Sequence, residues 1–431
     1  MKSMQVSHID TASNYFVLTA LCQLYAFLIP VWGLLGLHIT LPSLNAAGVT
    51  VLSTRQGFEL IIVMLFLICT PVKELSPRNV IIPLVAISWF VLITLRAALS
   101  PLAGHGAYQI IQLAQSLGIV AVGVVIANQP LSVRIGVLVG FLRGAAVVAA
   151  ASYYQLFLGN IYFGGRLTYS AGANPAGLAF YYALSIIVCL YLHSVSERKS
   201  SWIFPLLFFA LSLTLTQGRN AILGLLVSWI LVIAWIPFIR KKSHRRMQRS
   251  SILRSILRGL LTAAIAVFAV VLLLPILTSL IDFELMTRRL LLLFSRDMDS
   301  MTASRWSIWA HYVTIIEKDS LTTMLWGRGA GMTQHEFMSP HNTYLQVLFE
   351  HGVIVLTIWI TFMLSILYVY RRTGGADQLF AKWLVVFGTL IMIGNDFAYS
   401  GIWIVLAFGQ IVHGWRWRRW GNLHRGHETV L

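Results

Sequence analysis

Apolar runs long enough to cross a lipid bilayer recur from one end of this chain to the other. A transmembrane helix needs about 20 consecutive apolar residues to cross the hydrocarbon core. Of the 431 residues, 58% are hydrophobic and 11% are charged, whereas soluble domains carry about 25% charged residues. The sequence therefore predicts an all-α polytopic membrane protein that forms one integral membrane domain over residues 1–431.

The same runs predict about twelve transmembrane helices. We expect them at residues 15–37, 57–71, 79–97, 107–127, 131–157, 171–193, 201–217, 220–238, 256–280, 341–370, 379–397 and 401–415. The second and the last are short for a span, so the number twelve depends most on these two.

Basic residues indicate how these spans are oriented. The formal net charge is +17, which in a soluble protein would suggest nucleic-acid binding. Here most Lys and Arg residues lie at span ends and in short loops, so we expect membrane lipids and no nucleic acid as partners. About twice as many lie on the side of the membrane that holds the N-terminus as on the opposite side, which predicts cytoplasmic N- and C-termini. The three cysteines fall within apolar runs and form no close pair, so we expect packing residues.

One extramembrane segment is long, about residues 281–340, and the topology places it on the outer, periplasmic face. Its acidic and basic residues are nearly equal in number, and long loops in compact proteins usually have a function. Residues 302–317 are expected to form a helix with an aromatic stripe lying at the membrane interface, anchored by Trp309 and Tyr312. A glycine-rich turn follows at residues 326–331.

The stretch Ser339–Gly352 joins this polar segment to a long apolar run. Pro340 suits the start of a helix, so we expect His341 in the first turn, where the helix dipole disfavours an imidazolium. A neutral histidine there can accept a proton. Gly352 lies eleven positions further on, which is three helical turns and places both residues on one face. The alternative is a hydrated histidine at a membrane boundary.

Several ionisable side chains are expected at the same outer face. Arg219 lies in a very short turn between two apolar runs, Arg305 begins the interfacial helix, and Arg166 precedes the sixth span. Asp396 lies at the outer end of the eleventh span. Ionisable groups at such depth are costly and are functional candidates, although each could also be a snorkelling anchor or part of a structural ion pair.

This combination of side chains suits one kind of chemistry. The fork of a guanidinium binds phosphate oxygens in a bidentate manner, so two arginines can neutralise a diphosphate leaving group without a metal ion. A neutral histidine can take the proton from an attacking hydroxyl. The set therefore fits glycosyl transfer from a lipid diphosphate, with no metal and no cofactor expected. The sequence has no Walker loop and no zinc-protease pattern.

At this point the sequence resembles the O-antigen ligases of Gram-negative bacteria, which share a domain with O-antigen polymerases and bacterial O-oligosaccharyltransferases. The resemblance covers about residues 160–360. It rests on His341-Asn342 followed by Gly352, on Gln217-Gly218-Arg219-Asn220, on Ser304-Arg305 with Trp309, on Trp326-Gly327-Arg328-Gly329 and on Asn174-Pro175.

The resemblance implies a metal-independent, inverting glycosyltransferase of the membrane-embedded GT-C class. Such an enzyme moves O-antigen from undecaprenyl diphosphate to a sugar hydroxyl of lipid A–core in lipopolysaccharide biosynthesis, on the periplasmic side of the inner membrane. By motif, His341 would be the catalytic base or acceptor-orienting group. The substrate-binding residues would be Arg219 and Arg305 on the diphosphate, with Arg166, Arg328, Asp396 and Asn342 as further candidates.

Three other functions remain open from the sequence. An O-antigen polymerase would use the same donor with a different acceptor, and a protein O-oligosaccharyltransferase would have a protein acceptor. The second is disfavoured because those enzymes tend to have an extra C-terminal region, whereas this sequence stops at Leu431. A membrane transporter or flippase would predict charges near the membrane midplane, whereas the charges here gather at one face.

Overall fold

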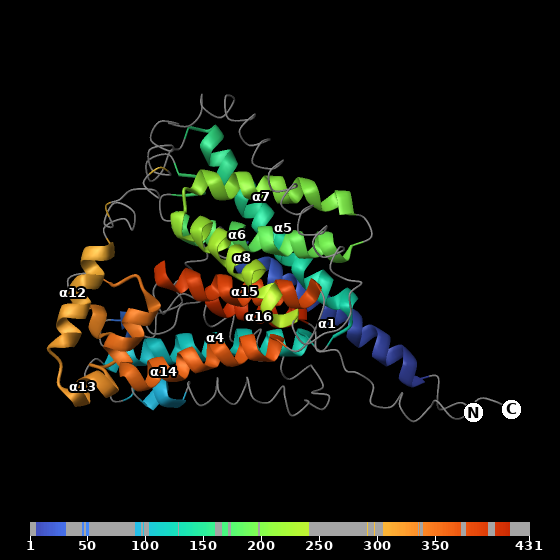
Figure 1. Ribbon diagram of the computed structural model, residues 1–431. Coiled ribbons are helices and arrows are strands. Elements are labelled where there is room, and N and C mark those ends of the chain that lie inside the picture. The colour runs from blue at the N-terminus through green and yellow to red at the C-terminus, as the bar shows by residue number, and fades with distance from the viewer. Residues whose placement is uncertain are drawn as a thin grey trace.

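A computed structural model gives the architecture of the chain (Figure 1). It describes residues 6–31, 45–46, 49–50, 91–95, 98, 103–127, 129–159, 166–170, 174–196, 199–240, 291, 297, 305–334, 336, 339–371, 376–394 and 401–413. Within these residues the structure is helical, apart from a short antiparallel ribbon of β1 (Asn45–Ala46) and β2 (Val49–Thr50). The predicted all-α class is therefore confirmed for the described part of the chain.

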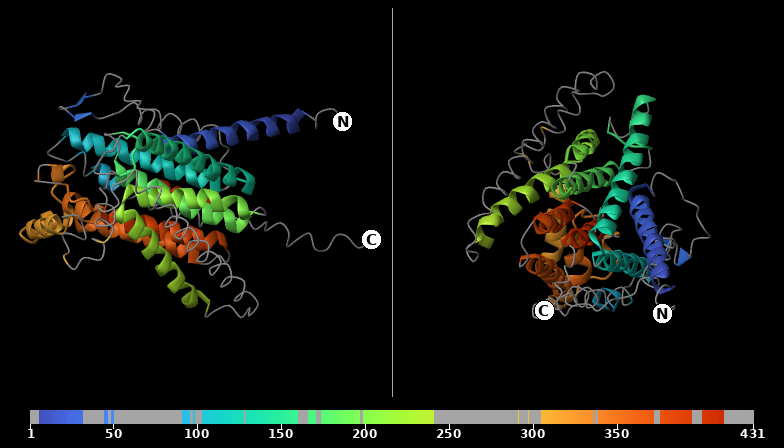
Figure 2. Two further views of the ribbon diagram at one scale, coloured as in Figure 1. Left: turned by 90° about the horizontal axis from the view of Figure 1, so that it is seen from above. Right: turned by 90° about the vertical axis from the view of Figure 1, so that its right-hand side faces the viewer.

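The helices form a bundle with a small cap at one end. They are α1 (Val6–Val31), α4 (Ala103–Ala127), α5 (Leu131–Phe157), α6 (Pro175–Val195), η1 (Lys199–Trp202), α7 (Ile203–Thr216), α8 (Arg219–Arg240), α12 (Arg305–Glu317), α13 (Leu321–Trp326), η4 (Met332–Gln334), α14 (Thr343–Arg371), α15 (Ala376–Ile391), η5 (Met392–Gly394) and α16 (Gly401–His413). The long helices run roughly side by side, and α12 and α13 lie at one end of the bundle with the start of α14 (Figure 2).

Several helices are long and apolar enough to cross a membrane. Four have the required length: Leu131–Phe157, Pro175–Val195, Thr343–Tyr368 and Asp377–Gly394. Five shorter apolar helices accompany them: Thr19–Val31, Gly118–Ala127, Ile203–Thr216, Arg219–Ile233 and Trp403–His413. The chain is thus a helical membrane protein. The count of about twelve spans stays a prediction, because the spans expected at 57–71 and 256–280 and most of 79–97 lie outside the described residues.

Small residues let α5 and α1 approach closely. Gly136, Gly140 and Gly144 lie four positions apart on α5, so they share one face. A Cβ added at Gly140 would lie 2.6 Å from the carbonyl oxygen of Gln23 on α1, and one at Gly144 would lie 2.2 Å from that of Phe27. Helices in membranes associate through such backbone contact, since lipid tails are as apolar as leucine and supply no hydrophobic drive.

The centre of the bundle is formed by α15 and its neighbours. Ala381, Leu384 and Val385 of α15 are fully buried. On the adjoining helices, Trp359 packs edge-on against Trp403 with ring centroids 5.2 Å apart. The indole N–H of Trp383 donates a 2.8 Å hydrogen bond to Ser228 Oγ, which ties α15 to α8. These contacts hold fixed the helix whose last turn reaches the candidate site.

Candidate functional site

Three chain segments that are distant in sequence meet at Gly394, just after α15. A guanidinium N–H of Arg305 donates a 2.8 Å hydrogen bond to the carbonyl oxygen of Gly394. The side-chain amide of Asn220 donates to the same oxygen at 3.1 Å. A Cβ at Gly394 would lie 1.9 Å from that amide nitrogen and 2.9 Å from the Arg305 guanidinium, so a side chain there would displace both. The start of α8, the start of α12 and the end of α15 are therefore locked together; we call this the Gly394 junction.

The turn between α7 and α8 places Arg219 beside this junction. Gln217 ends α7 in the left-handed conformation, with φ 52°. The carbonyl of Gly218 then accepts the first amides of α8, from Ala221 and Ile222. A Cβ at Gly218 would lie 2.2 Å from Ala179 Cβ on α6, so the turn packs directly on that helix. Arg219 is consequently the first residue of α8, next to Asn220 and half-buried.

The residue that follows Arg166, Leu167, ties this segment to the end of α7. The amide of Leu167 donates a 2.9 Å hydrogen bond to the carbonyl of Leu215 in the last turn of α7. Leu215 lies four positions before Arg219, so the segment that carries Arg166 runs beside the α7–α8 turn. The structure thus brings the predicted candidates Arg166, Arg219 and Arg305 to one end of the bundle, which we call the site end.

His341 differs from its predicted placement. The side-chain oxygen of Asn342 accepts the amides of Tyr344 at 3.1 Å and Leu345 at 3.2 Å, so Asn342 is the N-cap and α14 begins at Thr343. The prediction that His341 lies in the first helical turn is therefore wrong. His341 stands just before the helix in the left-handed region, with φ 45°, and is half-buried. His341 therefore precedes the helix and does not lie on one of its faces.

Two hydrogen bonds fix the backbone on either side of His341. The indole N–H of Trp309, on α12, donates to the carbonyl of Pro340 at 2.8 Å. The hydroxyl of Tyr344 donates to the carbonyl of Thr389 in the last turn of α15 at 2.9 Å. The residue before His341 is thus tied to the helix that begins at Arg305. The turn after it is tied to the helix that leads to the Gly394 junction.

Residues 204–360, which include α8, α12, α13 and the start of α14 but end before α15, match a family model described as O-antigen ligase. The chain carries an O-antigen ligase domain. This confirms the family that the sequence resembles, and no curated protein matches the chain. The match begins after Arg166 and includes Arg219, Arg305, Arg328 and His341.

The O-antigen ligase domain contains a break in α14 that the sequence did not predict. Gly352 has φ 81° and ψ 178°, a backbone conformation open essentially only to glycine. His341 and Gly352 therefore do not share one continuous helical face, and that expectation is wrong. At the break, the amides of Arg328 and Gly329 donate to the carbonyls of Phe349 and Glu350, each at 2.9 Å.

Main chain packs on main chain at this break. A Cβ at Gly352 would lie 2.2 Å from the carbonyl oxygen of Leu325, and one at Gly327 would lie 2.3 Å from that of Glu350. Gly327 also has a positive φ of 76°. The two glycines allow the turn after α13 to take over carbonyls that the broken helix leaves without an intrahelical donor. We call this contact the Gly327–Gly352 joint.

Glu350 is a polar residue of the domain that the sequence reasoning did not select. It is 0% exposed, and its carboxylate accepts the Thr333 amide at 3.3 Å and the Thr333 hydroxyl. The hydroxyl of buried Tyr312 donates to the carbonyl of Thr333 at 3.3 Å. Tyr312 is therefore not the interfacial anchor that was expected. An acid inside an apolar run was the signal that could have identified Glu350, because buried carboxylates need several donors.

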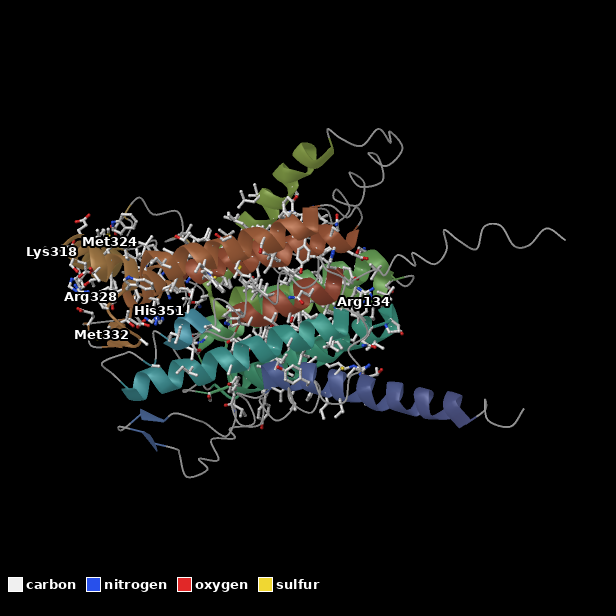
Figure 3. The ribbon with its side chains drawn as sticks, turned by 90° about the horizontal axis from the view of Figure 1, so that it is seen from below. Arg134, Lys318, Met324, Arg328, Met332 and His351 are labelled. Atoms are coloured by element: carbon white, nitrogen blue, oxygen red, sulfur yellow. The ribbon has the colours of Figure 1, made fainter. Side chains whose placement is uncertain are left out.

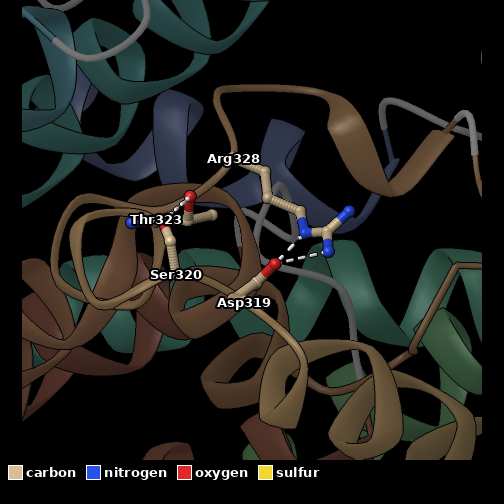
Figure 4. Close-up of polar contacts among 4 residues, drawn as sticks. All are labelled: Asp319, Ser320, Thr323 and Arg328. Carbon is tan, nitrogen blue, oxygen red and sulfur yellow. Dashed lines mark hydrogen bonds and ion pairs between the residues drawn. The ribbon is translucent and has the colours of Figure 1, made fainter.

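Arg328 has an ionic partner within the cap formed by α12, α13 and the start of α14. Its guanidinium donates to both carboxylate oxygens of Asp319, at 2.5 and 3.2 Å, and lies 5.1 Å from the ring centre of Phe349 (Figure 4). These contacts orient it across the Gly327–Gly352 joint, and its role on the diphosphate stays a prediction. Figure 3 shows Arg328 at the same end as His351, with Arg134 toward the other end.

The remaining predicted site residues divide into two groups. The Asn342 side chain caps α14, which fixes the direction of its oxygen toward the helix amides. Asp396 lies outside the described residues, two positions after Gly394 in the sequence. The backbone thus brings Arg166, Arg219 and Arg305 to the site end, and the segment that carries His341 is bonded to α12 and α15.

Proposed function

We propose that this chain is an O-antigen ligase that transfers O-antigen polysaccharide from undecaprenyl diphosphate to a sugar hydroxyl of lipid A–core. The O-antigen ligase family supports a membrane glycosyl-transfer enzyme of ligase or polymerase type. The observation that carries the proposal is the Gly394 junction, which holds Arg305 beside the first turn of α8, where Arg219 begins the helix. The backbone around His341 is tied to the same helices.

The arginines would bind the diphosphate of the donor lipid. Arg219 and Arg305 are the first residues of α8 and α12, so their guanidinium groups accompany the positive ends of two helix dipoles. The positive end of a helix dipole and a guanidinium fork both favour phosphate oxygens. This combination suits a leaving group whose negative charge grows as the glycosidic bond breaks.

His341 would act on the acceptor hydroxyl. In an inverting transfer, the hydroxyl oxygen forms a bond to the anomeric carbon as the bond from that carbon to the diphosphate oxygen breaks. The hydroxyl proton passes to the imidazole of His341, and the electron pair of the broken bond leaves with the diphosphate. The left-handed turn keeps His341 outside α14, which is compatible with an imidazole that meets a hydrated acceptor next to a membrane-bound donor.

The proposal includes a location and an architecture. The protein is a multi-pass GT-C enzyme of about twelve helices in the bacterial inner membrane, with both termini cytoplasmic and the site end facing the periplasm. The basic-residue bias supports this orientation. A reporter fused after Arg371 is expected to read as cytoplasmic, and one inserted near residue 300 as periplasmic. The reverse result would place the site end on the wrong side of the membrane.

An in vitro transfer assay tests the proposed function. Purified protein is mixed with polyprenyl-diphosphate-linked glycan and lipid A–core, and wild type is compared with His341→Ala. We expect transfer to lipid A–core that is lost in the variant. His311→Ala is the matched control, since His311 lies on the exposed side of α12 in the same cap and is expected to keep activity.

The other outcomes of this assay separate the alternatives. Growth of the donor glycan on a second donor molecule would identify a polymerase. Transfer to a protein acceptor would identify an oligosaccharyltransferase, and no transfer to any acceptor would favour a transporter. Because the arginines would neutralise the diphosphate, we also expect activity to persist in EDTA. Loss of activity that Mg²⁺ restores would contradict the metal-independent mechanism.

A further inference from the structure

Asn220 shares a hydrogen-bond acceptor with one of the arginines proposed to bind the diphosphate. The carbonyl oxygen of Gly394 accepts from the Asn220 amide at 3.1 Å and from the Arg305 guanidinium at 2.8 Å. A carbonyl oxygen has two lone pairs, so these two donors can use both of them. The amide nitrogen and the guanidinium are therefore next neighbours around a single backbone atom.

Asn220 also fixes the first turn of α8, which begins with Arg219. Before Arg219, Gly218 lies so close to α6 that an added Cβ would be 2.2 Å from Ala179 Cβ. After Arg219, Asn220 bonds to the carbonyl that follows α15. Successive residues of a helix are separated by only about 1.5 Å along its axis, so the backbone of Arg219 is held from both sides.

The shared carbonyl relates the two arginines to each other. Arg219 begins α8 and Arg305 begins α12, and these helices lie far apart in the sequence. Through Gly394, the start of one helix has a defined place beside the start of the other. A diphosphate presents several oxygens at once, so its binding depends on the relative placement of two guanidinium groups as well as on the presence of each.

A primary amide is the side chain that suits this position. Its N–H donates to the carbonyl without adding a charge beside Arg305. A carboxylate of the same shape could not donate when ionised, and it would attract the Arg305 guanidinium, as Asp319 attracts that of Arg328. An aliphatic side chain of similar size would leave the Gly394 carbonyl with one donor fewer.

We propose that Asn220 is a positioning residue for the donor diphosphate: by sharing the Gly394 carbonyl with Arg305, it sets the placement of Arg305 relative to Arg219. The inference rests on the proposed function, in which both arginines bind the diphosphate. Asn220 acts through the arginines and not on the substrate itself. A displacement of about 1 Å between binding groups can lower a rate by about 100-fold, so the loss of one such bond is measurable.

The test compares Asn220→Leu and Asn220→Asp with Ser228→Ala in the purified full-length protein. Ser228 is the matched control, because its hydroxyl accepts a 2.8 Å hydrogen bond from Trp383. That bond ties the same two helices, α8 and α15, about 12 Å further along α8. Two quantities are measured: kcat for transfer to lipid A–core, and the Kd of glycan-free polyprenyl diphosphate from the rise in unfolding temperature that it causes.

Asn220→Leu is expected to lower kcat and to weaken the binding of polyprenyl diphosphate, each by at least about tenfold. Asn220→Asp is expected to weaken binding further, because its carboxylate would pair with Arg305 and compete with the phosphate oxygens. Ser228→Ala is expected to lower the unfolding temperature about as much as Asn220→Leu, but to keep kcat and Kd within about twofold of wild type.

Two results would overturn the proposal: wild-type kcat and Kd in folded Asn220→Leu and Asn220→Asp, or losses of the same size in Ser228→Ala. Transfer by the wild type would show in either case that the proposed function itself still holds. Failure of the wild type to bind polyprenyl diphosphate would instead refute the diphosphate site, and the positioning role with it.

A further variant applies if Asn220→Leu does not fold. Asn220→Gln keeps the amide but moves it by one methylene, and it is expected to weaken the binding of polyprenyl diphosphate several-fold. An unchanged Kd in that variant would equally contradict the proposal.

Discussion

The Gly394 junction and the Gly327–Gly352 joint both place an arginine beside a glycine, yet the two arginines have different acceptors. At the junction, Arg305 donates to the neutral backbone carbonyl of Gly394, which orients its guanidinium against the end of α15. At the joint, Arg328 donates to the carboxylate of Asp319 and lies over an aromatic ring. A neutral acceptor orients a cation without cancelling its charge, whereas a carboxylate does both.

The comparison separates two uses of the same side chain within one domain. Under the proposed function, Arg305 would bind the diphosphate with a fork that the Gly394 carbonyl already orients. Arg328 is suited to hold α13 against α14, because its charge is matched inside the cap. The sequence places Arg328 in a glycine-rich motif but does not show its ionic partner. It therefore could not tell whether Arg328 binds an anion or holds α13 against α14.

The strongest challenge to the comparison is the removal of the arginines at the site end. Arg219→Ala and Arg305→Ala are each expected to lower transfer to lipid A–core by at least about 100-fold, because each removes charge stabilisation of the leaving diphosphate. Arg305→Lys tests the fork, since it keeps the charge and loses bidentate geometry, and it is expected to recover little activity.

The measurement is the in vitro transfer rate, with membrane insertion and unfolding temperature recorded for each variant. Lys318→Ala is the control within the same cap. Near-normal transfer by a folded Arg305→Ala variant would contradict the assignment of diphosphate binding to the Gly394 junction.

The joint predicts a loss of stability on substitution. Gly352→Ala is expected to lower the free energy of unfolding by about 2–4 kcal/mol, because the new Cβ would meet the Leu325 carbonyl in a backbone conformation already unfavourable for alanine. Gly159→Ala separates the two causes, since Gly159 has φ 75° and nothing lies within 4 Å of an added Cβ. Equal losses in thermal unfolding for both variants would show that main-chain contact at the joint contributes nothing.

The pair Asp319–Arg328 is expected to contribute less. A double-mutant cycle with Asp319→Asn and Arg328→Gln is expected to give a coupling energy of about 1 kcal/mol, because the two side chains are 9% and 28% exposed and remain partly screened. Transfer activity of the folded variants is expected to fall far less than in Arg305→Ala. A loss of comparable size in Arg328→Gln would instead place Arg328 with the anion-binding arginines.

The smallest effect is expected for the bond from α12 to the residue before His341. Trp309→Phe keeps the aromatic volume and removes the indole N–H that Pro340 accepts, at a cost of about 1 kcal/mol in stability. A modest fall in kcat with little change in KM is expected, because the backbone next to His341 would lose its hydrogen bond to α12. An unchanged kcat would show that the Trp309 bond does not position His341.

The sequence predicted those features that depend on composition along the chain. Apolar runs determine where helices can cross a membrane, and the span predicted at 131–157 coincides with α5. The short turn at Arg219 was also predictable, because two apolar runs were separated by a few polar residues. The family could be recognised from the order of its motifs along the chain, and this needed no knowledge of the contacts between them.

Other features depended on competition between local signals or on distant contacts. Pro340 favours a helix start, but Asn342 is a better cap, and its bonds to two amides move the start past His341. The break at Gly352 does not disturb apolar periodicity, so periodicity could not reveal it. The Gly394 junction joins residues 174 positions apart, and no local pattern records such a contact.

The Gly327–Gly352 joint has a consequence for changes in chain length. Its hydrogen bonds run between main-chain atoms, so they depend on register more than on the identity of most neighbouring side chains. Inserting a residue between Glu350 and Gly352 would move the glycine away from Leu325 and place a side chain where the backbones touch. The domain should therefore accept substitutions around this joint more readily than insertions or deletions within it.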